Sequence, residues 1–141
     1  MKYFLDTSVL VPVFVDEHPH HEASLAVFSR ADKKHAGCAA HSLAEVYATL
    51  TRLPGRHRAS ASEAMLFLGN IEERLAFISL DAEEYWRAMV HSAESGIVGG
   101  TIYDALLAHC ALKARAEIIF TWNIDHFRRV GPEVAKRVRT P

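Results

Sequence analysis

The segment Lys2-Tyr3-Phe4-Leu5-Asp6 decides the fold class, because aromatic and apolar residues run up to a carboxylate. Such a run is typical of a short strand. Residues 7–15 follow at once and are predicted to form a short helix, whose length Pro12 limits. A strand that passes directly into a helix is the first half of a βαβ unit, so the chain begins like an α/β protein.

The same alternation of strand and helix continues along the chain. The expected strands cover residues 36–40, 77–80 and 117–121, and the expected helices cover residues 19–31, 42–53, 60–75, 81–94 and 101–115. Neither an internal repeat nor a low-complexity linker divides the chain, and a short basic tail ends it. We therefore expect a single α/β domain over residues 1–141, with a mainly parallel sheet and ligands outside the carboxyl ends of its strands.

The composition is that of a globular domain: 141 residues, 50% of them hydrophobic, with a net charge of −1. It excludes disordered, collagen-like and coiled-coil proteins, and the strongly basic signature of many nucleic-acid binders. The uncharged run 7–15 is too short to span a bilayer and lacks a small-residue cleavage site, so we expect no membrane segment and no secretory signal. Cys38 and Cys110 are expected to be buried free thiols of a cytoplasmic protein.

Three carboxylates stand at predicted junctions, and each has a structural alternative. Asp6, followed by Thr7 and Ser8, suits a cation or a phosphate, but it also suits the N-cap of the next helix. Glu45 and Asp104 each follow a hydroxyl residue at the spacing of a capping box. The same spacing recurs elsewhere in the chain, in the pairs Ser60/Glu63 and Asp81/Glu84. Capping spacing alone therefore does not separate functional acids from structural ones.

The surroundings of Asp104 favour a functional site. At helical spacing it shares a face with Leu107, Ala108 and Ala111. The other faces of its helix are also mostly apolar, so the helix should be buried nearly all round. The helix dipole offers such a carboxylate about 0.3–1 kcal/mol. That is less than the cost of burying an unpaired charge, so a cation or another partner is expected there.

Three further positions could complete a site. Arg52 continues the helical face of Glu45 about 10 Å along the axis, where it could bind a phosphate beside a metal, or simply favour the helix C-terminus. Asn123 and Asp125 follow the strand 117–121 and supply oxygen ligands, although an Asx turn would place them there equally well. Three acids and an amide make a hard oxygen donor set, which suits Mg²⁺ or Mn²⁺ and phosphoryl chemistry.

These motifs, taken in order, resemble those of a known family. Phe-Leu-Asp6-Thr-Ser, Ser-Leu-Ala-Glu45-Val, Gly-Gly-Thr-Ile-Tyr-Asp104-Ala-Leu and Thr-Trp-Asn123-Ile-Asp-His-Phe are similar to segments of PIN-domain ribonucleases, above all the VapC toxins of type II toxin–antitoxin modules. The resemblance runs from Lys2 to about Phe127. It implies a three-layer α/β/α sandwich, Mg²⁺ or Mn²⁺ in an acidic pocket, endonucleolytic cleavage of RNA, a homodimer and a cognate VapB-like antitoxin.

The resemblance also assigns roles to single positions. The three family acids fall on Asp6, Glu45 and Asp104. The hydroxyl that often supports the first acid falls on Thr7 or Ser8. The fourth position is frequently Asp in the family and is Asn123 here, which retains an oxygen ligand but loses the charge; Asp125, two residues on, is the alternative. With RNA and an antitoxin implied as partners, Arg52 could contact an RNA phosphate or the antitoxin.

Two other functions and one other site are alternatives to this interpretation. A phosphatase of the haloacid-dehalogenase type needs a second Asp two residues after the first, where this chain has Ser8. An inactive PIN-like module that binds RNA or protein would have no need of all three acids. His18, His20 and His21 form a cluster, but zinc would need a closed set of four ligands, so a solvated helix start is the favoured interpretation.

Overall fold

The computed structural model describes residues 1–141 and contains one parallel sheet of five strands, in the order β3-β2-β1-β4-β5. The strands are β1 (Tyr3–Leu5), β2 (Ala36–Ala39), β3 (Ala76–Ile78), β4 (Ile118–Phe120) and β5 (Val138–Arg139). The helices are α1 (Thr7–Val13), α2 (His21–Ser29), α3 (Ala40–Thr51), the 3₁₀ turn η1 (Gly55–His57), α4 (Ala61–Arg74), α5 (Ala82–Glu94), α6 (Thr101–Lys113), α7 (Ile124–Arg128) and α8 (Pro132–Ala135). All four strand pairings are parallel, as expected.

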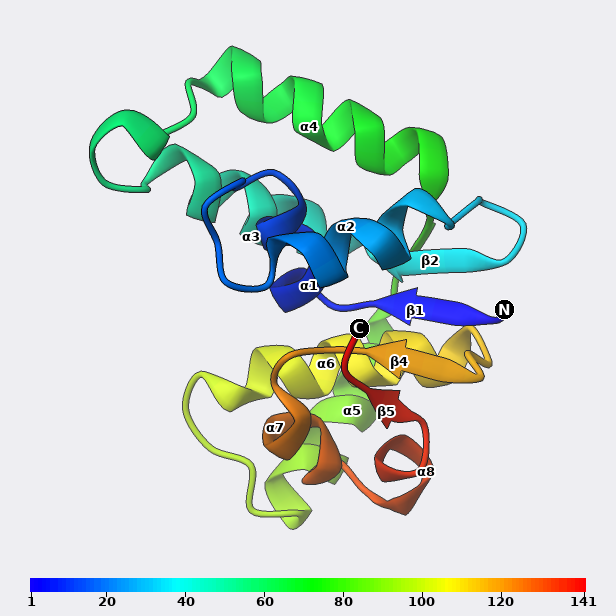
Figure 1. The fold of residues 1–141 in the computed structure, drawn as a ribbon. Coiled ribbons are helices and arrows are strands. Elements are labelled where there is room, and N and C mark those ends of the chain that lie inside the picture. The colour runs from blue at the N-terminus through cyan, green and yellow to red at the C-terminus, as the bar shows by residue number, and fades with distance from the viewer.

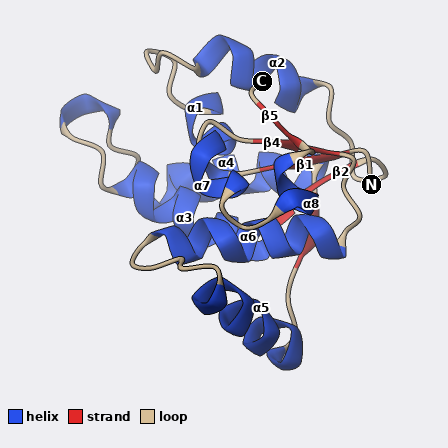
Figure 2. Ribbon diagram, turned by 90° about the horizontal axis from the view of Figure 1, so that it is seen from below, coloured by secondary structure: helices blue, strands red, loops and turns tan.

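The sheet is the middle of three layers. In Figure 1, α1 to α4 gather in the upper half of the molecule and α5 to α8 in the lower half. Figure 2 shows α6 lying along the strands, with α5 packed outside it. Because side chains alternate across a strand, Phe4 belongs to the core under α6 while Leu5 belongs to the core under α1 and α3. The expected α/β/α sandwich is confirmed.

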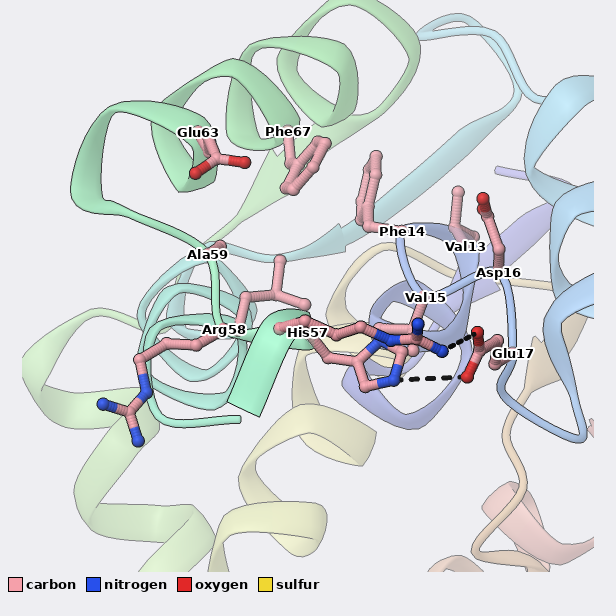
Figure 3. A pocket seen from close by; sticks show the side chains of 12 residues that line it. Val13, Phe14, Val15, Asp16, Glu17, His57, Arg58, Ala59, Glu63 and Phe67 are labelled. Atoms are coloured by element: carbon pink, nitrogen blue, oxygen red, sulfur yellow. Dashed lines mark hydrogen bonds and ion pairs between the residues drawn. The ribbon is translucent and has the colours of Figure 1, made fainter. Parts of the chain in front are cut away.

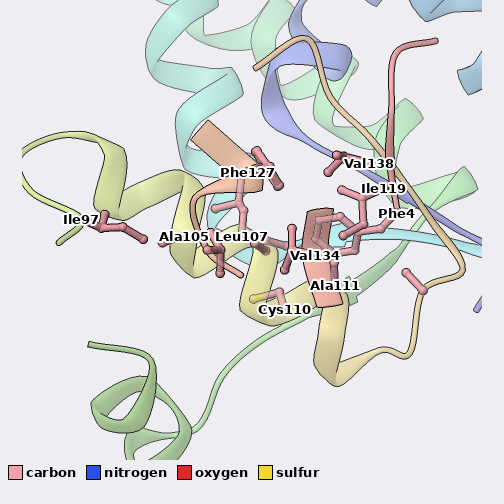
Figure 4. Close-up of a cluster of buried hydrophobic side chains, with 14 residues drawn as sticks. Phe4, Ile97, Ala105, Leu107, Cys110, Ala111, Ile119, Phe127, Val134 and Val138 are labelled. Carbon is pink, nitrogen blue, oxygen red and sulfur yellow. The ribbon is translucent and has the colours of Figure 1, made fainter. Parts of the chain in front are cut away.

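Each face of the sheet has its own hydrophobic core. The core on the α6 side combines residues of β1, β2, β4 and β5 with residues of α6, α7 and α8, and its largest members, Phe4 and Phe127, are fully buried (Figure 4). Six residues of α6 are buried, so this helix is enclosed nearly all round, as its sequence predicts. Cys38 and Cys110 are buried free cysteines, also as predicted.

The topology fixes where a ligand can bind. From β1 the chain moves outward through β2 to β3 on one side, and β4 and β5 lie on the other side of β1. The strand order therefore reverses between β1 and β4. The loops beyond the carboxyl ends of these two strands run in opposite directions there and leave space for a ligand. Asp6 follows β1 at this point, and Asn123 lies in the loop after β4.

The expected strands and long helices are present, with ends that differ by a few residues. The sequence predicts no particular element after residue 121, and the structure adds α7, α8 and β5 there. The capping boxes Ser60/Glu63 and Asp81/Glu84 both form. No helix is long and apolar enough to cross a membrane.

Candidate active site

A polar cavity of about 470 Å³ opens at the carboxyl edge of the sheet. It gathers side chains from the loops after β1 and β4, from α3 and from the first turn of α6. Its lining consists of Asp6, Thr7, Ser8, Val11, Pro12, His18, His20, Glu45, Thr49, Asp104, Trp122 and Asn123. The structure thus brings six of the sequence-predicted positions, namely Asp6, Thr7, Ser8, Glu45, Asp104 and Asn123, into one space.

Asp6 is the most deeply placed of the acids, with 1% of its surface exposed. One carboxylate oxygen, Oδ2, accepts hydrogen bonds from the Ser8 hydroxyl (2.6 Å), the Ser8 backbone N–H (3.3 Å) and the Thr121 hydroxyl (2.8 Å). The bond from the Ser8 N–H makes Asp6 the N-cap of α1, so the structural alternative also holds. The other oxygen, Oδ1, is buried and has no hydrogen-bond partner.

Burial raises the pKa of Asp6 from its ordinary 3.8 to about 6. The hydrogen bonds from Ser8 and Thr121 oppose this rise, whereas the negative charge of Asp104 adds to it. An acid with a raised pKa and an orphaned buried oxygen is costly for the folded protein, and a bound cation would relieve the cost.

Glu45 lies in the middle of α3 and is held by a hydroxyl from the neighbouring helix. Thr7 Oγ1 is 3.0 Å from Glu45 Oε1 and 2.9 Å from Ser42 Oγ. The pKa of Glu45 is raised, first by burial and also by Asp104, while Thr7 and His41 oppose the rise. Repulsion between Asp104 and both other acids shows that the three carboxylates form one electrostatic group.

Asp104 stands in the first turn of α6 and accepts a hydrogen bond at Oδ2 from His126 Nδ1, at 2.7 Å. His126 belongs to α7, and the sequence analysis missed this contact. The partners are 22 positions apart, and only the folding of α7 against α6 brings them together.

Asn123 and Asp125 diverge, although they are two residues apart. The Asn123 side chain lines the cavity, and its backbone N–H donates to Thr121 Oγ1 at 2.9 Å. Asp125 is exposed on α7 and is absent from the cavity lining. Thr121 was also missed by sequence reasoning; it is fully buried, and its hydroxyl joins the loop after β4 to Asp6.

The capping alternatives for Glu45 and Asp104 are wrong. Helix α3 begins at Ala40 and α6 at Thr101, and neither has a side-chain cap. The Thr101 hydroxyl instead donates to the Val98 carbonyl at 2.7 Å. Neither carboxylate is therefore engaged in capping.

Arg52 lies outside the acidic cavity. It is exposed at the C-terminal end of α3 and lines an adjoining pocket of about 350 Å³ together with Glu45, Thr49 and Tyr103. The shared helical face expected from the sequence is therefore present, and it leads from Glu45 toward the guanidinium.

One side of the acidic cavity is formed by three rings, those of His18, His20 and Trp122, which we call the aromatic wall. The His20 and Trp122 rings stack with centroids 3.6 Å apart and planes 8° apart. The His18 ring lies 5.5 Å from His20 at 40°. Burial, with His20 and His21 nearby, lowers the pKa of His18.

The donor set fits a hard divalent cation that retains several waters. Its oxygens come from Asp6, Glu45, Asp104 and Asn123, and Oδ1 of Asp6 has no protein partner. No three His, Cys, Asp or Glu side chains converge closely enough to form a metal site by themselves, and this includes the three acids of the cavity as well as the histidines of the aromatic wall. Oxygen donors that line a shared open cavity suit Mg²⁺ or Mn²⁺ better than zinc.

A second pocket, of about 450 Å³, lies between the end of α1, η1 and α4 (Figure 3). Here Glu17 pairs with Arg56 at 3.0 Å and with His57 at 3.2 Å, and the Phe14 and Phe67 rings stack 4.7 Å apart. Its acids are paired or exposed and none is deeply buried, so it lacks the features of the acidic cavity.

Comparisons with known proteins agree with this architecture. The family model of the PIN domain matches residues 3–132. Ribonuclease VapC40 of Mycobacterium tuberculosis is 36% identical over 114 residues, which are 81% of each chain. Ribonuclease VapC27 of the same organism is 36% identical over 115 residues, covering 81% of this chain and 80% of that protein.

Solved structures show the same fold at lower sequence identity. The toxin VapC20 of M. tuberculosis, described as cleaving the sarcin–ricin loop, superposes with a TM-score of 0.72 at 13% identity, covering 89% of this chain and 92% of that one. A chain of VapBC2 from Rickettsia felis, bound to promoter DNA, gives 0.67 at 19% identity, covering 99% and 98%. The chain therefore belongs to the PIN-domain family and, within it, to the VapC group.

Proposed function

We propose that this protein is a metal-dependent endoribonuclease and the toxin of a toxin–antitoxin pair. One observation carries the proposal: Asp6 is buried with an unpartnered oxygen in a cavity that it shares with Glu45, Asp104 and Asn123. A carboxylate so placed is costly without a cation, and a cation there would attract the phosphates of a nucleic acid. Relatives named ribonucleases, 36% identical, support RNA as the substrate.

The residues proposed to hold Mg²⁺ or Mn²⁺ are Asp6, Glu45 and Asp104, with Asn123 as a neutral fourth donor. When bound, the ion would polarise a phosphoryl oxygen and favour in-line attack by water. Because Asn123 carries no charge, the donor set has three negative charges rather than four. That favours one firmly held ion over two.

The remaining residues orient these donors. Ser8 and Thr121 fix one oxygen of Asp6 and leave the other free. Thr7 holds Glu45, and His126 holds Asp104.

The proposal extends to partners and location. Solved relatives include toxin–antitoxin complexes from Rickettsia felis and Salmonella typhimurium, which supports a VapB-like antitoxin for this chain. A homodimer belongs to the same proposal. We place its surface on α4 and α5, which carry most of the large exposed apolar side chains, among them Leu66 and Trp86. Two buried free cysteines suit a reducing cytoplasm.

Substitution of one acid tests the activity, with a neighbouring acid as control. We expect Asp104→Asn to lower RNA cleavage in Mn²⁺ by orders of magnitude while thermal unfolding stays close to that of the wild type. Asp125→Asn, an identical chemical change on an exposed carboxylate, should leave cleavage nearly unchanged. Undiminished cleavage by metal-stripped protein, or by Asp104→Asn, would refute the mechanism. RNA binding without any cleavage in Mn²⁺ would instead favour the PIN-like binding module.

A further inference from the structure

We propose that the aromatic wall is a subsite for one nucleobase of single-stranded RNA, beside the carboxylates that act on its phosphate. The inference rests on the proposed function and specifies the substrate further. Aromatic rings on one side of a cavity and carboxylates on the other match the two chemical parts of a nucleotide. A base has flat faces that stack on aromatic rings, and a phosphate is drawn to a cation held by acids.

The rings of the wall are fixed through their edges and the adjoining backbone. Trp122 Nε1 donates to the hydroxyl of Ser24, a fully buried residue, at 3.0 Å. The backbone N–H of His20 donates to Nδ1 of His18 at 3.0 Å. These bonds engage ring nitrogens and the backbone and leave the ring faces free of hydrogen bonds. The His20 and Trp122 rings cover one face of each other, so the outer face of each is left to stack on a base. Preorganised rings lose little conformational entropy when a ligand stacks on them.

One hydroxyl couples the wall to the reacting centre. Ser8 Oγ accepts the backbone N–H of Trp122 at 2.9 Å and donates to Asp6 at 2.6 Å. The backbone of Trp122 and the carboxylate of Asp6 are therefore anchored on the same atom. A nucleotide whose phosphate lies at the acids has the wall within the same cavity.

The lining also argues for a base rather than a phosphate at the wall. No Lys or Arg side chain lines the cavity, so it has no permanent cation for a second phosphate. Bases in a duplex are already stacked on one another, whereas unpaired bases are free to stack on protein. The subsite therefore selects single-stranded segments and tolerates several bases.

Binding of RNA with and without bases tests the subsite. A labelled ten-nucleotide oligouridylate and an abasic oligomer of the same ribose–phosphate backbone are titrated by fluorescence anisotropy in Ca²⁺, and both are recovered to verify that they are intact. We expect the wild type to bind the base-bearing oligomer about tenfold more tightly, the effect of one stacked base. His20→Ala should lose this preference and retain the affinity for the abasic oligomer.

Two variants complete the design. His20→Phe preserves an aromatic ring and should keep the preference for bases. His35→Ala removes an exposed imidazole just before β2, at the opposite edge of the sheet, and should change nothing. The proposal is overturned if the wild type shows no preference for bases, if His20→Ala retains it, or if His20→Phe loses it while folding normally.

The outcome is separable from that of the proposed function. Metal-dependent cleavage without a preference for bases would refute the subsite alone. A preference for bases in a protein that cleaves no RNA would refute the ribonuclease assignment and leave the subsite in place.

Discussion

Replacement of Asp6 by asparagine should stabilise the metal-free protein at neutral pH, although it removes an acid of the candidate site. Burial raises the pKa of Asp6 from 3.8 to about 6 in the folded protein. Well below pH 4 the carboxyl is protonated in both the folded and the unfolded state, so burial of a charge does not reduce the stability. As the pH rises toward 6, the Asp6 carboxyl is already ionised in the unfolded protein but is still largely protonated in the folded protein. The folded protein therefore loses stability over this range.

The size of the effect follows from the shift. A rise from 3.8 to about 6 corresponds to about 3 kcal/mol in total, most of it lost between pH 4 and pH 7. The asparagine oxygen can replace Oδ2 and accept from Ser8 and Thr121, so the N-cap of α1 survives. The amide nitrogen then takes the unpartnered Oδ1 position, where protonated Asp6 would place its own O–H. That penalty is similar in both proteins at low pH and cancels.

Urea unfolding in EDTA from pH 4 to pH 8 measures the difference directly. The wild type and Asp6→Asn should have similar free energies of unfolding at pH 4, and the variant should be more stable by about 3 kcal/mol at pH 8. Asp125→Asn, which changes an exposed carboxylate, should show no such gain. Addition of Mg²⁺ at pH 8 should then stabilise the wild type more than Asp6→Asn. A difference between the two proteins that is equal at pH 4 and pH 8 would refute the reasoning.

Two further predictions concern surfaces outside the cavity. Arg52→Ala should weaken RNA binding and reduce the salt dependence of that binding by about one phosphate contact. Arg30 is an exposed arginine at the end of α2, and Arg30→Ala should have neither effect. If Arg52→Ala leaves affinity and salt slope unchanged, Arg52 is only a charge at the end of its helix. Light scattering should report a dimer, and Trp86→Glu, at a side chain 72% exposed on α5, should shift it toward monomer; a monomeric wild type at micromolar concentration would contradict the dimer.

The central architecture could be predicted from the sequence because its signals are local. Apolar runs such as Tyr3–Leu5 and Ile118–Phe120 form the middle strands. In a parallel sheet their carboxyl ends meet at one edge, so the placement of Asp6 and Asn123 follows from strand position alone. The nearly all-apolar sequence of α6 likewise indicates a buried helix. Asp104 is the one acid near its start, so it stands out as a candidate site residue.

The tail could not be predicted, because its structure depends on distant partners. The strand β5 has two residues, Val138 and Arg139, and exists through pairing with β4. The Arg137 carbonyl accepts from Ile119 N at 3.0 Å, and such a bond leaves no trace in local composition. His126 escapes sequence reasoning in the same way, since its neighbours in the chain give no sign that it reaches Asp104.

Four hydroxyl–acid or acid–acid pairs share the capping-box spacing, and the structure divides them by environment. The pairs on the exposed starts of α4 and α5 form capping boxes, as local chemistry favours. At α3 the helix begins before Ser42, and at α6 it begins at Thr101, so the hydroxyl does not occupy the cap position in either case. Both helices forgo a side-chain cap worth about 1 kcal/mol. Their acids point into the cavity instead, where repulsion from each other and from Asp6 adds to the cost. Among these four pairs, the capping box is absent from the two whose acids line the cavity and present in the two whose acids do not. Such a division is expected where stability is given up for binding.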